Sequence, residues 1–156
     1  MALDAFDLKI LAALQGSGRM TNQELATRVG MATSPCWRRV RQLEADGVIS
    51  GYRVTLDRKQ LGLGILAYVR VKIDSHSEKE ARQFELEVGK LDEVVACYAV
   101  AGDSDFLLQV VARDLESYSE FAMSRLRRLP GIKEMETTFV LREIKPLGPL
   151  PLQGGR

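Results

Sequence analysis

The hydrophobic residues in the first third of the chain recur at three- and four-residue intervals, the spacing of one face of a helix. A first run begins after Asp4, a candidate helix cap, and is broken by the Gly-Ser-Gly of residues 16–18. A second run begins after Thr21, which can form a capping box with Glu24, and ends at Gly30. The pattern therefore predicts two short helices.

A third helix is predicted to open at Ser34-Pro35, because serine supplies a capping oxygen and proline suits the first helical position. Its core face would carry Cys36, Val40 and Leu43. The second and third predicted helices are short, are joined by a tight turn, and the third carries arginines that face outward. This arrangement predicts a helix-turn-helix whose third helix lies in the major groove of DNA. The residues on its outward face or flanks are Ser34, Trp37, Arg38, Arg39 and Arg41.

Residues 48–56 alternate in polarity and are rich in β-forming side chains. This pattern predicts a strand or a small wing that leads out of the helical module. We therefore expect a winged helix-turn-helix domain over residues 1–51 and a β linker over residues 52–64.

The pattern changes after residue 64. Strand-like alternation or apolar runs occupy four segments, and helical spacing occupies two. The order is β-α-β-β-α-β, which predicts an α+β fold with a ferredoxin-like βαββαβ domain over residues 65–145. Both helices would cover one face of a four-stranded antiparallel sheet, so the other face favours dimerisation. The Pro/Gly-rich tail, residues 146–156, is expected to be flexible or to lie on a partner surface.

Composition narrows the class of protein. No apolar run approaches the ~20 residues that a membrane helix needs, and the N-terminal residues are acidic where a signal peptide is basic, so we expect a cytoplasmic protein without a membrane partner. Two cysteines make a disulfide framework improbable, and Cys36 and Cys97 are expected to be buried hydrophobes. The single histidine, His76, is expected in a solvated loop and excludes a His-rich metal site. We expect no metal, no cofactor and no catalytic residues.

The net charge of +1 conceals an asymmetry. Residues 1–62 carry nine basic and six acidic side chains, a net +3, and the remaining 94 residues carry 13 basic and 15 acidic, a net −2. This division indicates a basic DNA-binding part and an acidic part with another role. Because +3 neutralises few phosphates, one copy should bind DNA weakly, which favours an oligomer.

Several short motifs follow one another from about residue 3 to residue 145. They are Leu3-Asp4, Leu8-Lys9-Ile10-Leu11, Asn22-Gln23-Glu24-Leu25-Ala26, Ser34-Pro35-Cys36-Trp37-Arg38-Arg39-Val40, Leu43-Glu44, Gly47-Val48-Ile49, Gly102-Asp103-Ser104-Asp105-Phe106-Leu107-Leu108 and Leu129-Pro130-Gly131-Ile132. In this order and spacing the sequence resembles the Lrp/AsnC, or feast/famine, family of bacterial and archaeal transcription regulators. The resemblance implies dimers that assemble into octamers or other higher forms, and an amino-acid effector bound between C-terminal domains of neighbouring subunits.

The resemblance places Ser34, Trp37, Arg38 and Arg41 at DNA-facing positions of the third helix. Arg39 matches an arginine that is nearly invariant in the family and either binds phosphate or braces the fold. Trp37 would touch a thymine methyl or a sugar, or pack beside the first helix. Thr21 and Asn22, with Gln23, start the preceding helix, where free amides suit a phosphate but where capping is an equally simple role.

The loop Gly102–Asp105 joins two predicted strands, and its residues are common turn formers. Its carboxylates could also receive the ammonium of an amino acid while its backbone amides bind the carboxylate. The resemblance places the effector site here, and the side chains hint at a mid-sized apolar or thiol-bearing ligand. The candidate effector residues are Tyr98, Ala101, Gly102, Asp103, Asp105, Leu115, Thr137, Thr138 and Phe139.

The leading hypothesis is therefore a sequence-specific DNA-binding regulator of amino-acid metabolism or transport, modulated by a small effector. An architectural, nucleoid-type DNA-binding protein without an effector is one alternative. A tetrapyrrole decarboxylase-like enzyme is another, because such enzymes resemble this two-domain layout. Their sites rely on histidines, of which this chain has one.

Overall fold

The computed structural model describes residues 3–74 and 78–152 of the chain. The chain divides into two compact units. Unit 1 comprises residues 1–55 together with residues 145–156, and unit 2 comprises residues 56–144. His76 lies outside the described residues. In the described part of the chain, no helix is both long and apolar enough to cross a bilayer.

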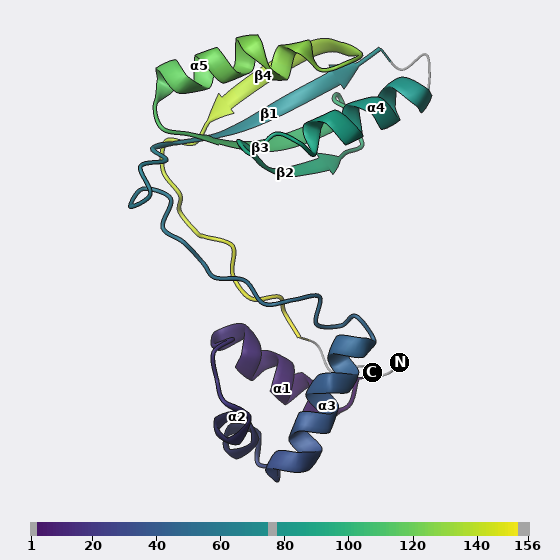
Figure 1. Cartoon of the computed structure of the whole chain (residues 1–156), viewed down its shortest axis with the longest axis vertical. Coiled ribbons are helices and arrows are strands. Elements are labelled where there is room, and N and C mark those ends of the chain that lie inside the picture. Colours follow the sequence, from purple (N-terminus) through teal and green to yellow (C-terminus); the bar gives the residue numbers. More distant parts are fainter. Residues whose placement is uncertain (1–2, 75–77, 153–156) are drawn as a thin grey trace. The chain divides into compact units, whose positions relative to one another are not determined.

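Unit 1 consists of three helices, α1 (Ala5–Gly16), α2 (Asn22–Val29) and α3 (Thr33–Ala45) (Figure 1). The predicted caps of the first two are confirmed. The Asp4 carboxylate accepts hydrogen bonds from the backbone N–H groups of Phe6 and Asp7, and the Asp7 carboxylate accepts one from the backbone N–H of Asp4. Gly30 ends α2 in the left-handed conformation, with φ of 73°. The core of this unit is formed by Ile10, Leu11, Ala13, Leu25, Ala26, Val29, Cys36, Val40 and Leu43.

The prediction that Ser34 caps α3 is wrong. The helix begins two residues earlier than predicted, at Thr33, and its N-cap is Ala32, which makes no side-chain capping bond. Ser34 and Pro35 therefore lie inside the first turn, where the N–H that proline lacks has no helical partner to lose. The predicted inward face is confirmed, since Cys36, Val40 and Leu43 are all buried.

The predicted strand over residues 48–56 is also wrong, as is the β character expected for residues 52–64. Residues 51–57 have no regular secondary structure, and residues 58–62 form turns. The alternation of polarity describes an extended chain correctly, but a strand also needs a partner to bond its backbone. Within the described residues this segment has no sheet partner, and Val54 is 82% exposed.

Unit 2 has the predicted β-α-β-β-α-β order, with a 3₁₀ turn before the last strand. The elements are β1 (Ile65–Ile73), α4 (Glu78–Val88), β2 (Val94–Ala99), β3 (Phe106–Ala112), α5 (Leu115–Ser124), η1 (Leu126–Arg128) and β4 (Ile132–Phe139). The sheet is antiparallel with strand order β2-β3-β1-β4, the arrangement expected of a ferredoxin-like domain.

Both helices cover the same face of this sheet (Figure 1). Phe84 of α4 and Phe121 of α5 are buried against Val69, Val71 and Leu108. The opposite face carries Tyr68 and two cross-strand ion pairs. These pairs are Arg70–Glu136, at 2.6 Å, and Lys72–Glu134, at 3.7 Å. In a single chain this second face is therefore open to solvent.

The helix α5 ends at Ser124, and Leu115, at its start, is 60% exposed. One expectation for unit 2, the burial of Cys97, needs correction. Cys97 is exposed because it lies on β2, an edge strand of the sheet.

Candidate DNA-binding surface and effector loop

The outward side of α3 carries the polar and aromatic residues that the sequence predicted. Ser34 and Arg38 are exposed, and Trp37 is 39% exposed. Arg38 makes no ion pair with any residue that the structure describes. Because Cys36 and Val40 anchor the opposite side of the helix, Arg38 is held on the surface with its guanidinium free for a ligand.

Trp37 and Arg41 form one surface feature. The Arg41 guanidinium lies 5.0 Å from the centroid of the indole ring, a cation–π arrangement, and 3.8 Å from the carboxylate of Glu44. The Trp37 ring is partly exposed and forms a platform for an exposed arginine one turn along the helix. DNA contact and packing beside the first helix both stay predictions for this residue.

Arg39 faces a different way. Its Nη1 atom donates to Asp4 Oδ2 at 2.6 Å and to Asp7 Oδ1 at 2.7 Å, so it joins α3 to the first turn of α1. Backbone bonding from Asp7, together with Arg39, lowers the pKa of the Asp4 carboxyl, and both carboxylates raise the pKa of the guanidinium. Two roles were expected for Arg39, phosphate binding or bracing of the fold, and the observed contacts are those of a brace between α1 and α3.

The start of α2 is occupied by its own cap. Thr21 Oγ1 donates to Glu24 Oε2 at 2.9 Å and accepts the Glu24 N–H at 3.2 Å, and the Thr21 backbone N–H donates to the same Glu24 Oε2 at 2.7 Å. The bond from the Thr21 backbone, followed by the bond from its hydroxyl, lowers the pKa of the Glu24 carboxyl and keeps it ionised. A phosphate approaching this helix start would therefore meet a negative charge, which favours capping as the role of Thr21. Asn22 and Gln23 are exposed.

The loop between β2 and β3 brings one free carboxylate to the surface. Ala101, Gly102 and Asp103 are exposed, and Gly102 has a φ of 136° that side chains rarely adopt. Asp105, by contrast, accepts the backbone N–H of Ile73 through Oδ2 at 2.8 Å. It ties the start of β3 to the end of β1, so Asp103 is the better candidate to receive an ammonium group.

The remaining candidate effector residues do not come together in one chain. Thr137 and Phe139 face the helices, where the Thr137 hydroxyl lies 2.5 Å from the Tyr118 hydroxyl and the Phe139 ring lies 5.0 Å from the Tyr118 ring. Thr138 pairs with Tyr68 on the opposite, open face, which also carries Tyr98. Leu115 lies at the start of α5.

Tyr118 was not among the predicted site residues. It is buried on α5, and its hydroxyl is the partner of the Thr137 hydroxyl. Burial raises the pKa of the Tyr118 hydroxyl. Among the described residues no group of His, Cys, Asp and Glu side chains is placed to hold a metal ion.

Comparison with known proteins finds two family models that match successive parts of the chain. Residues 3–50 match the family model of a winged helix-turn-helix DNA-binding domain, and residues 66–150 match that of the Lrp/AsnC ligand-binding domain. The leucine-responsive regulatory protein of Rhizobium meliloti (strain 1021) is 41% identical over 143 residues, which cover 92% of this chain and 92% of the relative. The DNA-binding transcriptional activator DecR of Escherichia coli (strain K12) is 34% identical over 151 residues, which cover 97% of this chain and 99% of the relative.

Solved structures are similar over nearly the whole chain. A transcriptional regulator from Neisseria meningitidis, in complex with L-Met, superposes with a TM-score of 0.92 at 39% identity, covering 96% of this chain and 97% of that one. AsnC of E. coli superposes with a TM-score of 0.86 at 25% identity, covering 94% and 97%. The sequence-based resemblance is confirmed: the chain belongs to the Lrp/AsnC family of DNA-binding transcriptional regulators, with a winged helix-turn-helix domain and a ligand-binding domain.

Proposed function

We propose that this regulator reads a specific DNA sequence through the outward side of α3. The observation that carries the proposal is the separation of the arginines on that helix. Arg39 is engaged with two carboxylates of α1, whereas Arg38 and Arg41 lie on the exposed surface. Arg38 is free to bond a guanine edge or a phosphate, and Arg41 is positioned by the Trp37 ring.

The DNA-binding form would be a homodimer or a larger homo-oligomer in the cytoplasm. Unit 1 has a small positive charge, so useful affinity requires several linked copies. The open face of the sheet supports this, because it exposes Tyr68 and Tyr98 beside residues that pair across strands. We propose this face as the dimer contact and the octamer as the larger assembly to test first.

The effector would be an amino acid bound at the loop Ala101–Asp105. The Asp103 carboxylate is available for the ammonium group, and exposed backbone amides of the loop suit the carboxylate. Thr138 and Tyr98 lie on one face and Thr137 on the other, so residues of a neighbouring subunit would complete the site. The Neisseria relative was solved with L-Met, and a mid-sized apolar amino acid is one of the two ligand types expected from the sequence.

The effector would act by shifting the population of assemblies or the freedom of the DNA-binding units. Its target would be a gene of amino-acid metabolism or transport. We propose no catalytic activity for this chain, since the curated relatives that it matches are regulators of transcription.

The proposal is tested by a gel shift with an operator selected from random DNA by the unaltered protein. Replacing both Arg38 and Arg41 by Ala should lower specific affinity about a hundredfold or more, because each arginine contact to a base is worth roughly 1–3 kcal/mol. Arg127→Ala, which removes an exposed arginine from unit 2, is the matched control. Size-exclusion chromatography should find the same oligomer in all three proteins. Unaltered affinity in the double variant would overturn the proposal.

A further inference from the structure

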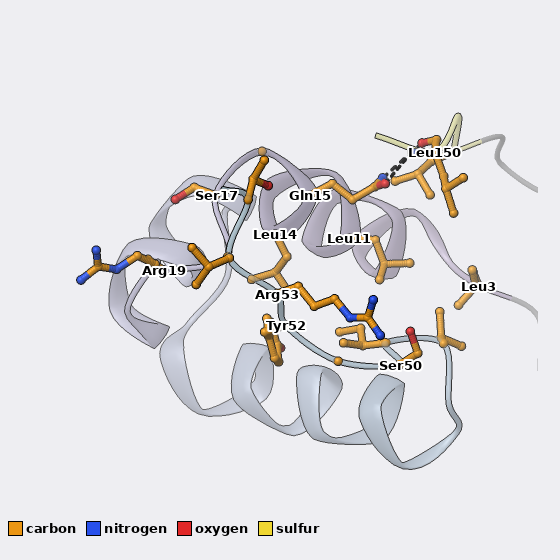
Figure 2. A pocket seen from close by; sticks show the side chains of 18 residues that line it. Leu3, Leu11, Leu14, Gln15, Ser17, Arg19, Ser50, Tyr52, Arg53 and Leu150 are labelled. Carbon is orange, nitrogen blue, oxygen red and sulfur yellow. Dashed lines mark hydrogen bonds between the residues drawn. The ribbon is translucent and has the colours of Figure 1, made fainter. Parts of the chain in front are cut away.

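The C-terminal tail makes a contact that neither DNA reading nor effector binding uses. Residues 147–152 have no regular secondary structure, yet they belong to unit 1 and not to the sheet domain that precedes them. Gln15, in the last turn of α1, bonds the backbone of Leu150 twice (Figure 2). Its Nε2 donates to the Leu150 carbonyl at 3.1 Å, and its Oε1 accepts the Leu150 N–H at 2.6 Å.

These two bonds satisfy both backbone groups of Leu150. Pro149 and Pro151 flank this residue and have no N–H, so Leu150 carries the single backbone donor of residues 149–151. A glutamine side chain offers one donor and one acceptor side by side, which is the pairing that a neighbouring strand would offer. Gln15 therefore recognises the backbone of the tail at the one point where both groups are available.

The tail also covers an apolar groove of unit 1. A cavity of about 810 Å³ lies between the end of α1 and residues 48–55, with Leu3, Leu11 and Leu14 among its lining residues (Figure 2). Leu150 and Leu152 form part of its wall. Leu152 is 36% exposed, whereas Leu147, outside the cavity lining, is wholly exposed. The side chain of Leu150 is itself 73% exposed, so among these three leucines the groove covers mainly Leu152, whereas Leu150 is held through its backbone by Gln15.

The opposite wall of the groove is held in place independently of the tail. Tyr52 lies in the segment 48–55, and its hydroxyl donates to Glu44 Oε1 of α3 at 3.0 Å. Prolines and the residues that precede them favour extended conformations, so the tail loses little conformational freedom when it docks. The groove and its occupant are thus both preorganised.

We propose that the groove between the end of α1 and residues 48–55 is a docking site for the chain's own tail, residues 146–152, with Gln15 as the recognition residue. The tail follows β4, so docking gives the DNA-binding unit a second link to the sheet domain, in addition to the linker of residues 56–64. This second link limits how freely the DNA-binding unit moves on its linker.

Hydrogen exchange measured by mass spectrometry at single-residue resolution tests the proposal in the full-length protein. The Leu150 amide should exchange at least about tenfold more slowly than the Leu147 amide, because only Leu150 is bonded to Gln15. Gln15→Ala should bring the Leu150 rate to within about twofold of the Leu147 rate. Alanine has the higher helix propensity, so α1 should remain intact.

Gln42→Ala is the matched control, since it removes another exposed glutamine of unit 1 whose bond, to Asp46, does not involve the tail. It should leave the Leu150 rate unchanged. Equal exchange at Leu147 and Leu150 in the unaltered protein, or slow exchange at Leu150 that persists in Gln15→Ala, would overturn the proposal. The measurement requires neither DNA nor effector, so its failure would leave the proposed function standing.

Discussion

The DNA-reading surface and the effector residues differ in how much of each a single chain assembles. Along α3, the exposed side chains Trp37, Arg38 and Arg41 occur within five consecutive positions and share one outward region. The candidate effector residues are spread over a loop, two strands and a helix, and Thr137 and Thr138 face opposite sides of one sheet. The candidate surface on the helix is therefore complete in one copy, whereas the proposed effector site would need residues of a neighbouring subunit.

Single substitutions of the two neighbouring arginines of α3, Arg38 and Arg39, test whether they have different roles. Arg39→Ala should lower the free energy of unfolding by about 2 kcal/mol, because Asp7, which is 8% exposed, loses a charged hydrogen-bond partner. Arg38→Ala should change it by less than about 0.5 kcal/mol. Urea unfolding followed by the fluorescence of Trp37, the sole tryptophan, measures both.

Arg39→Lys controls for charge, since it keeps the cation but loses the planar fork that reaches two carboxylates. We expect it to recover only part of the loss. If Arg38→Ala proves as destabilising as Arg39→Ala, the division of α3 into a reading side and a bracing side is wrong.

The effector loop has a corresponding pair of carboxylates. Asp105→Ala should cost about 1.5 kcal/mol of stability, because the Ile73 N–H loses its acceptor at a half-buried position. Asp103→Ala should leave the melting temperature unchanged but abolish any rise on addition of L-Met, the first effector to screen. Melting curves followed by circular dichroism, with and without the amino acid, separate the two effects.

An unaltered L-Met response in Asp103→Ala would remove Asp103 from the effector site. Loss of the response in Asp105→Ala alone would assign the ammonium contact to Asp105 and contradict its structural role. Both outcomes are read from the same set of curves.

The parts of the molecule that could be predicted from sequence are those whose causes are local. Helical spacing placed Cys36, Val40 and Leu43 in the core, and the capping boxes at Asp4 and Thr21 involve residues three positions apart. The strand expected at residues 48–56 failed because pairing depends on a partner that local alternation does not reveal.

Long-range contacts explain the rest. Arg39 was left with two roles because its carboxylate partners lie more than 30 positions away, and the tail contact joins residues 135 positions apart. One missed feature was available from the sequence: neighbours on a strand point to opposite faces, so Thr137 and Thr138 cannot face the same ligand within one chain. The register of strand pairing then determines which residues of the neighbouring strand lie beside Thr137 and Thr138 on each face.

A smaller effect tests whether the start of α2 is a cap or a phosphate site. Thr21→Ala should lower stability by about 1 kcal/mol through loss of its capping bonds, and Thr21→Ser should restore most of it. Asn22→Ala should leave stability nearly unchanged. A gel shift under conditions where each variant remains folded should find Thr21→Ala close to the unaltered protein. A large loss of DNA affinity in Thr21→Ala but not in Asn22→Ala would instead assign a phosphate contact to the threonine.

The smallest expected effect is a difference in acid sensitivity that comes from the caps of unit 1. The pKa values of Asp4 and Glu24 are both lowered in the folded protein, by backbone bonds together with Arg39 or Thr21. Their contribution to stability is therefore complete above the pKa of the unfolded chain and is lost as the pH falls through the lower, folded pKa. The window lies at and below the ordinary values of 3.8 and 4.5.

Urea midpoints of unit 1, followed by Trp37 fluorescence between pH 7 and pH 3, measure this loss. Thr21→Ala should lose slightly less stability across the window than the unaltered protein, because the Glu24 carboxylate loses the hydroxyl donor of residue 21 but keeps its backbone N–H. Arg39→Ala should flatten the profile further at the acidic end, where Asp4 titrates. If both variants follow the unaltered profile, the capping carboxylates do not govern the acid response of the DNA-binding unit. The brace at Arg39 would then stabilise the helix pair by geometry alone.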